Sequence, residues 1–244
     1  MLDPWTLALS PVLFVQGKWV RLRTPKLPEA PGPRSGEQGQ GPPLSLMIIG
    51  DSAAAGVGIE HQHRALTGKL AEQLQSHCRL SWQLHARSGL NTGQALHLID
   101  AINAEAIDVV LVSLGVNDAL SPVSRQRWLN QTAALTHTLR RRFQPSLILL
   151  TALPPLGVFP GLPWPLSAHL GHRANRFNRA LSQWAAPQQD IGILDLTTGA
   201  TLLTEHLAPD RFHPGEPVHQ HWAELATTHI RPLVPSPAPD QTAP

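Results

Sequence analysis

Four separate stretches of this 244-residue chain carry residue types that together could transfer an acyl group. The first holds Ser52, which follows an apolar run and is flanked by small residues. The second and third hold Gly89 and Asn117, and the fourth holds Asp210 and His213 near the C-terminus. Each residue alone has an ordinary explanation as a turn glycine, a capping side chain or a loop residue. Together they supply a nucleophile, a base, a carboxylate and candidate donors for an oxyanion.

The serine needs a base, and the histidine is the candidate. A serine hydroxyl is a weak nucleophile until a base accepts its proton, and a neutral imidazole does this near neutral pH. Asp210 lies three residues before His213, close enough to curl back to its Nδ1 atom and fix its tautomer. Pro214 biases the backbone of His213 away from the helical region, which helps to hold this corner. The pattern predicts serine-based acyl transfer, with Ser52 as the attacking group.

Such a reaction passes through a tetrahedral oxyanion, which must receive hydrogen bonds. The backbone N–H groups of Ser52 and Gly89 and the side-chain amide of Asn117 are the candidate donors. No Gly-x-Ser-x-Gly motif is present, which disfavours the strand-to-helix elbow of the ordinary α/β-hydrolases.

These stretches must be positioned by strands, because apolar runs precede them. Short apolar or alternating runs predict strands at 44–49, 78–86, 108–114, 146–152 and 191–195. Apolar residues at helical spacing predict helices at 64–75, 92–103, 124–142, 167–186 and 216–230. Alternating strands and helices predict one α/β domain, with a parallel sheet covered on both faces. The carboxyl ends of parallel strands share one edge of the sheet, so the loops that follow them should meet there.

The four stretches resemble the four sequence blocks of the SGNH (GDSL-type) hydrolase superfamily, in the same order. They read Gly50-Asp51-Ser52, Gly89, Gly115-x-Asn117-Asp118 and Asp210-x-x-His213-Pro214. The resemblance covers residues 44–230 and implies a flavodoxin-like three-layer α/β/α sandwich with five parallel strands. It also implies esterase, lipase or lysophospholipase, thioesterase or carbohydrate-deacetylase activity, with no metal or cofactor.

By this resemblance Ser52 is the nucleophile, His213 the base and Asp210 its orienting acid, while Ser52, Gly89 and Asn117 form the oxyanion hole. Two blocks depart from the usual pattern. The common leucine after Gly-Asp-Ser is Ala53 here, at a position without a chemical role. The second block usually reads Ser-Gly-Asp-Thr but here continues from Gly89 as Leu-Asn-Thr, which leaves Gly93 as an alternative donor. We favour Gly89 because it lies nearer to the end of the predicted strand.

A proline-rich loop at 153–166 follows the fourth predicted strand and should overhang the same edge. Its large apolar side chains include Leu156, Phe159, Leu162 and Trp164. They could line an acyl-binding wall, or they could simply pack against the domain. Together with the apolar N-terminus they favour lipid-like or medium-chain acyl esters or thioesters as substrates. A carbohydrate O-deacetylase, an acyltransferase and an inactive ligand-binding scaffold are the alternatives.

The predicted hydrolase domain spans 44–231, between an N-terminal region at 1–43 and a proline-rich tail at 232–244. In the N-terminal region, uncharged residues 4–17 are too few to span a bilayer, which needs about 20. We expect this segment to pack as an accessory helix. The alternatives are peripheral contact with a membrane interface through residues 4–23, with Trp5, Phe14 and Trp19 as anchors, and an atypical signal or anchor. The rest of the region, at 24–43, is rich in Pro and Gly and predicts a linker with little packing.

The composition narrows the possible partners. The formal net charge is +2, and no basic stripe with interleaved aromatic residues is present, so nucleic acid is not an expected partner. Cys78 is the only cysteine, which permits no intramolecular disulfide and is compatible with a cytoplasmic location. The sequence contains no Cys/Cys or His/Cys spacing of the kind that forms a structural zinc site. The expected partner is a small-molecule acyl ester.

Overall fold

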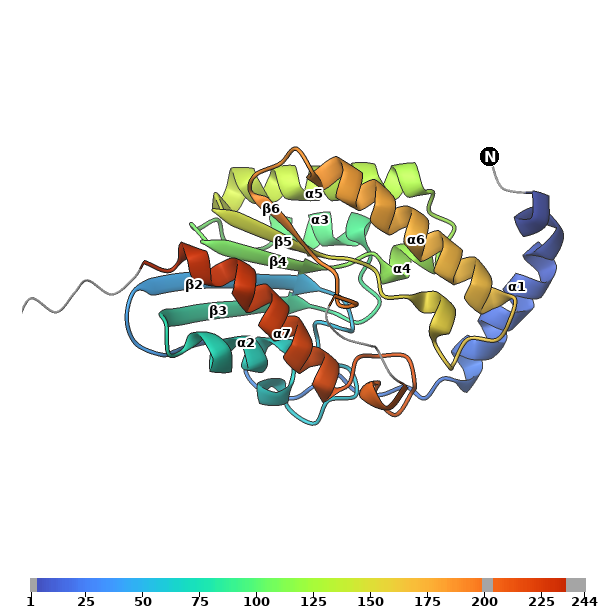
Figure 1. The fold of residues 1–244 in the computed structure, drawn as a ribbon, viewed down its shortest axis with the longest axis horizontal. Coiled ribbons are helices and arrows are strands. Elements are labelled where there is room, and N and C mark those ends of the chain that lie inside the picture. The colour runs from blue at the N-terminus through green and yellow to red at the C-terminus, as the bar shows by residue number, and fades with distance from the viewer. Residues whose placement is uncertain (1–3, 199–203, 236–244) are drawn as a thin grey trace, which may run out of the picture.

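The computed structural model describes residues 4–198 and 204–235, so most of the predicted tail at 232–244 lies outside it. Within these residues, one six-stranded sheet forms the centre of the molecule, in the order β1-β3-β2-β4-β5-β6 (Figure 1). The strands are β1 Ser35–Gln38, β2 Pro43–Gly50, β3 Arg79–Ala86, β4 Val109–Ser113, β5 Leu147–Thr151 and β6 Ile191–Leu194. The last five are parallel and correspond to the five predicted strands. Their order is that of flavodoxin-like sheets, in which ligands bind where the order of successive strands reverses, here between β2 and β4.

Helices cover both faces of the sheet, as predicted (Figure 1). One face packs against α3 Thr92–Asp100, α5 Arg125–Phe143 and α6 Leu166–Ala185. The other packs against α2 Leu66–Leu74 and α7 Glu216–Ile230. Along β2, Met47 and Ile49 join the first core and Leu46 and Ile48 join the second. Burial on both faces explains why the central strands are nearly continuous apolar runs.

The stretch at 24–43 packs more than its composition predicted, and the prediction of a loose linker is corrected. It contributes β1, which pairs antiparallel with β3 at the edge of the sheet and makes the sheet six-stranded. Just before β1, Ala30 is buried and Arg34 donates a hydrogen bond to the carbonyl of Ala86. β1 forms because it can pair with β3, which is distant in sequence, whereas the local Pro and Gly residues indicated only turns.

The apolar N-terminal segment forms helix α1, Pro4–Arg23, which lies beside the start of α6 (Figure 1). The side-chain amide of Gln16 ties the two helices together. Its Nε2 donates to the carbonyl of Trp164 at 2.8 Å, and its Oε1 accepts from the backbone N–H of Leu166 at 3.1 Å. Leu13 and Val20 pack against the core on the α6 side of the sheet. The segment is therefore an accessory helix, as expected.

The outer side of α1 carries a second apolar stripe, which faces solvent. Val15, Trp19 and Leu22 are 64%, 48% and 86% exposed. Across the described ranges, no helix combines the length and apolarity needed to cross a bilayer. The side chain of Trp5 lies outside the described part of the structure. Contact of residues 4–23 with a membrane interface stays a prediction.

Candidate active site

Ser52 lies in a tight turn at the carboxyl end of β2, at the switch point of the sheet. The strand ends at Gly50, where a Cβ atom would lie 2.4 Å from the Cβ of Ala54, so the close approach requires glycine. The backbone N–H of Asp51 donates to the carbonyl of Ser113 on β4 at 3.1 Å. The carboxylate of Asp51 accepts from the N–H of Ala53 at 3.0 Å. These contacts hold the turn in place, so that Ser52 lies at the edge of the sheet.

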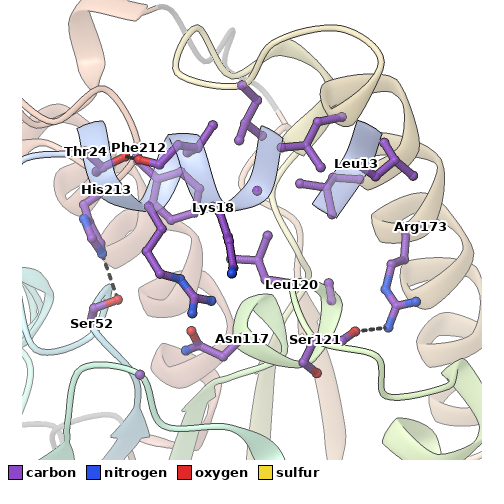
Figure 2. Close-up of a pocket in the computed structure, with 18 of the residues that line it drawn as sticks. Leu13, Lys18, Thr24, Ser52, Asn117, Leu120, Ser121, Arg173, Phe212 and His213 are labelled. Atoms are coloured by element: carbon purple, nitrogen blue, oxygen red, sulfur yellow. Dashed lines mark hydrogen bonds between the residues drawn. The ribbon is translucent and has the colours of Figure 1, made fainter. Parts of the chain in front are cut away.

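His213 connects this serine to Asp210, although His213 and Ser52 are 161 residues apart in the chain. Its Nε2 lies 2.8 Å from Oγ of Ser52 (Figure 2), and its Nδ1 lies 2.5 Å from Oδ2 of Asp210. The other carboxylate oxygen of Asp210 accepts from the backbone N–H groups of Phe212 and His213, at 3.0 Å each. Arg211 adopts the left-handed region, with φ 60°, so that the chain turns tightly between the two residues. The three side chains form one continuous hydrogen-bonded line.

The surroundings of Asp210 favour its ionised form. Burial opposes its charge, but the hydrogen bonds from the His213 side chain and from the backbone outweigh burial, so its pKa lies below the usual value. Its side chain is fully buried, whereas that of His213 is 18% exposed. A buried carboxylate at Nδ1 leaves Nε2 as the acceptor that faces Ser52. The arrangement can therefore remove the proton from the serine hydroxyl.

Two backbone N–H groups near Ser52 are available to an oxyanion. The N–H groups of Ser52 and Gly89 have no hydrogen-bond partner among the described residues, and both residues border the same pocket. Gly89 has φ +80°, a conformation that favours glycine although a side chain would meet no atom there. The alternative, Gly93, lies inside the first turn of α3 and does not border the pocket.

The loop that carries Gly89 is held by Glu29, a residue that the sequence analysis missed. The carboxylate of Glu29 accepts from the backbone N–H of Ser88 at 2.8 Å and from its hydroxyl at 2.7 Å. Burial disfavours the charge of Glu29, but the bonds from Ser88 and Arg34 lower its pKa overall. Its one sequence signal is that no other acidic residue lies between Asp3 and Glu37.

Asn117 lies in the short helix α4, Val116–Ala119, directly after β4. Its Nδ2 atom donates to Oδ2 of Asp51 and to the carbonyl of Leu90, both at 3.0 Å. Both hydrogens of this amide therefore already have acceptors. Asp51 and the carbonyl of Leu90 thus fix the orientation of the amide, and an oxyanion bound beside Ser52 would share one of its hydrogens with the carboxylate of Asp51.

Asp51 itself is buried, and this gives a pH-dependent prediction. Burial raises its pKa from 3.8 to about 6. In the unfolded chain it ionises at lower pH, so the native state loses stability as pH rises from about 4 to 6. The Asp51→Asn variant lacks this loss, so its free energy of unfolding relative to wild type should increase by up to about 3 kcal/mol across that range. Urea titrations at several pH values measure this, and a constant difference would contradict the prediction.

The candidate residues open into a pocket of about 1010 Å³, which α1 closes on one side (Figure 2). Ser52, His213, Gly89 and Asn117 all border it, together with the ring of Phe212. The helix α1 contributes residues between Ser10 and Arg21 to the opposite wall. Sequence reasoning did not predict this wall, because the apolar pattern of α1 runs almost all round the helix and does not indicate which side faces the domain.

The predicted acyl-binding loop is distributed between the pocket and the core. Leu162 borders the pocket. Phe159 is buried and packs edge-on against Phe212, with ring centroids 5.6 Å apart, so it stands behind the pocket wall. Leu156 is buried in the core, and the side chain of Trp164 is 77% exposed. The structure thus brings one of the four side chains to the pocket and a second one behind it.

No group of three or more His, Cys, Asp or Glu residues suited to a metal ion occurs in the part of the chain that the structure describes. The pair His219 and His221, two residues apart in α7, does not form such a group. His219 is fully buried beside Trp222, and burial lowers its pKa to about 4. This histidine is a core residue.

Solved structures similar to this chain share its fold. They include TesA, with a TM-score of 0.64, 20% identity, and coverage of 78% of this chain and 99% of that one. The psychrotrophic esterase EstA from Pseudoalteromonas sp., in a structure inhibited by monoethylphosphonate, has a TM-score of 0.59 and 17% identity, covering 78% and 97%. An acetylxylan esterase from Geobacillus stearothermophilus has a TM-score of 0.60 and 17% identity, covering 79% and 95%.

Sequence comparison identifies the family more directly. No match was found among curated proteins. The GDSL-like lipase/acylhydrolase family, however, matches residues 48–221, which include Ser52, Asn117, Asp210 and His213. The match spans most of the chain and agrees with the fold and with the order of the four sequence blocks. This chain belongs to the GDSL-like lipase/acylhydrolase family, a family of hydrolases.

Proposed function

We propose that this protein is a serine hydrolase that cleaves carboxylic esters or thioesters through an acyl-enzyme on Ser52. The observation that carries the proposal is the line of hydrogen bonds from Asp210 through His213 to Ser52, which ends at the pocket. Membership of the hydrolase family supports it. The unpartnered N–H groups of Ser52 and Gly89 supply the donors that acyl transfer requires.

The proposed reaction has two halves. Nε2 of His213 takes the hydroxyl proton as Oγ of Ser52 bonds to the substrate carbonyl carbon, and the carbonyl oxygen becomes an oxyanion. The bond to the leaving oxygen or sulfur then breaks, and His213 returns the proton to the leaving alcohol or thiol. A water molecule next attacks the acyl-enzyme, again giving its proton to His213. Collapse of this second intermediate releases the carboxylic acid and restores Ser52.

The pocket favours a lipid-like or medium-chain acyl group over acetyl. Its volume of about 1010 Å³ lies at the upper end of the usual range for small-molecule sites. Apolar side chains supply much of its lining; they include Leu13, Val20, Leu120, Leu162, Leu166, Leu170 and Phe212. Burying each methylene of an acyl chain against them gains about 0.8 kcal/mol.

A fluorophosphonate tests the nucleophile, because such reagents label activated serines. We expect mass spectrometry to find the adduct on the peptide that contains Ser52 in the wild type. We expect no labelling in Ser52→Ala, and labelling slowed by 10³-fold or more in His213→Ala, since attack needs the base. Ser167→Ala, which changes a half-buried serine of α6 outside the pocket, is the control. A wild-type protein that does not react would favour the inactive scaffold.

A panel of 4-nitrophenyl esters from acetyl to palmitoyl tests the acyl preference. We expect kcat/KM to rise from acetyl to a medium chain, because each added methylene contacts apolar lining. A maximum at acetyl would contradict the acyl proposal and favour a deacetylase. Transfer to an added alcohol in preference to water would instead indicate an acyltransferase that uses the same serine.

A further inference from the structure

The wall of the pocket formed by α1 is positively charged. Its side of the pocket carries Lys18 and Arg21, and Lys26 follows shortly after the helix. On the opposite side, α6 contributes Arg173. No aspartate or glutamate borders the pocket in the described ranges. A cleft lined by one sign of charge focuses the field and concentrates ligands of the opposite sign.

Within the described ranges, the three cations near the N-terminus are not paired with a carboxylate. None of Lys18, Arg21 and Lys26 lies within 4.0 Å of a carboxylate oxygen among the described residues. The ammonium of Lys18 rests 4.8 Å from the ring centre of Phe14, which also borders the pocket. Figure 2 shows the Lys18 side chain reaching from α1 into the pocket, between the Ser52–His213 pair and Arg173. Its charge is thus directed into the space that a substrate must enter.

Arg173 is a further cation, on the wall of the pocket opposite α1. Its Nη2 donates to three backbone carbonyls, those of Asp118, Ser121 and Val123. The buried carboxylate of Asp118 interacts with its charge from behind the pocket wall but makes no ion pair within 4.0 Å among the described residues. Its Nε is buried and has no hydrogen-bond partner among the described residues. A half-buried cation with an unused donor adds to the positive potential of the pocket.

The charged wall and the catalytic floor come from different parts of the chain. The family match begins at residue 48, whereas α1 ends at Arg23. The candidate catalytic residues thus lie in the family region, and the cations of α1 lie outside it. The accessory helix thus brings two cations, Lys18 and Arg21, to the pocket from outside the family region.

We propose that the pocket selects acyl esters or thioesters whose alcohol or thiol portion carries a negative charge, which Lys18 and Arg21 bind while the acyl chain lies on the apolar lining. This inference rests on the proposed hydrolase function. A phosphate or carboxylate near the ester bond provides the required charge. Lys18 and Arg21 are exposed, so binding the phosphate or carboxylate of a substrate removes little of their hydration.

A matched pair of substrates tests this selection. The compounds 1-decanoylglycerol 3-phosphate and 1-decanoylglycerol carry the same acyl chain and the same ester bond and differ only in the phosphate. Both are used below their critical micelle concentrations, so that no charged aggregate is present. We expect wild-type kcat/KM to be about tenfold or more higher for the phosphate, mainly through KM, and the ratio to fall as salt screens the charges.

The double variant Lys18→Gln/Arg21→Gln should reduce this ratio by about tenfold. Arg23→Gln is the control: it removes one positive charge from the same helix, where the double variant removes two, but Arg23 does not border the pocket and instead packs over Trp19. The control should keep the wild-type ratio. Circular dichroism and fluorophosphonate labelling of Ser52 verify that each variant is folded.

Two results would overturn the inference. One is equal kcat/KM for the two esters in the wild type; the other is a drop in the ratio in Arg23→Gln that is at least half as large, on a logarithmic scale, as the drop in the double variant, which would indicate the general charge of the helix. Either outcome leaves the proposed function intact as long as the neutral ester is hydrolysed. Absence of hydrolysis of both esters and of every 4-nitrophenyl ester would instead overturn the proposed function.

Discussion

Replacing Ser52 by alanine is expected to lower kcat/KM for a medium-chain 4-nitrophenyl ester by about 10⁴-fold or more. The hydroxyl is aligned with an imidazole, at 2.8 Å from Nε2 of His213. The backbone N–H of residue 52 remains in the variant, so the loss measures the nucleophile alone. Initial rates with purified protein give the ratio, and Ser167→Ala should retain wild-type activity.

His213→Ala should lose a similar factor, and the double variant Ser52→Ala/His213→Ala should lose no more than the worse single variant. Groups that act as one unit are strongly non-additive, because the second loss removes nothing that the first has left functional. His172, an exposed histidine of α6, provides the control substitution His172→Ala. Full activity in Ser52→Ala, or multiplicative losses in the double variant, would exclude the proposed mechanism.

Ser52, Asn117, Asp210 and His213 were predictable because each lies in a short motif that local sequence patterns define. The apolar runs that form β2 and β4 predict two buried strands, and parallel strands present their carboxyl ends at one edge. Ser52 and Asn117 follow those two strands, so their proximity follows from the topology. Asp210 and His213 belong to one turn, in which a spacing of three residues brings carboxylate and imidazole together.

The elements around these residues were not predictable, because they are positioned by partners distant in sequence. β1 forms against the edge of β3, and Glu29 reaches a loop 59 residues further along the chain. An accessory helix at residues 4–17 was expected, but the place of α1 over the pocket depends on Gln16, which bonds to residues about 150 positions away. Local composition carries no record of such contacts. The positive charge of the pocket, on which the proposed selection of anionic substrates rests, results from cations that are distant in sequence and meet only in the folded structure.

Removal of the Asn117 amide should have a large effect on catalysis, although a smaller one than the loss of Ser52 or His213. Loss of one oxyanion donor typically costs about 2.7–4 kcal/mol of activation free energy, so Asn117→Ala should lower kcat by about 10²- to 10³-fold with little change in KM. Asn130→Ala, an exposed position on α5, is the control. An effect below about threefold would mean that the N–H groups of Ser52 and Gly89 suffice.

Asp51 should act through this amide as a positioning residue. Its carboxylate accepts from both Ala53 and Asn117, whereas an amide in its place has one oxygen and can accept only from one of them at full strength. Asp51→Asn should therefore lower kcat, by about tenfold, because the amide of Asn117 loses its fixed orientation. In the Asn117→Ala background the same substitution should change kcat by less than about threefold, since the group that it orients is gone. Equal losses in the two backgrounds would show that Asp51 acts independently of Asn117, through the turn that carries Ser52.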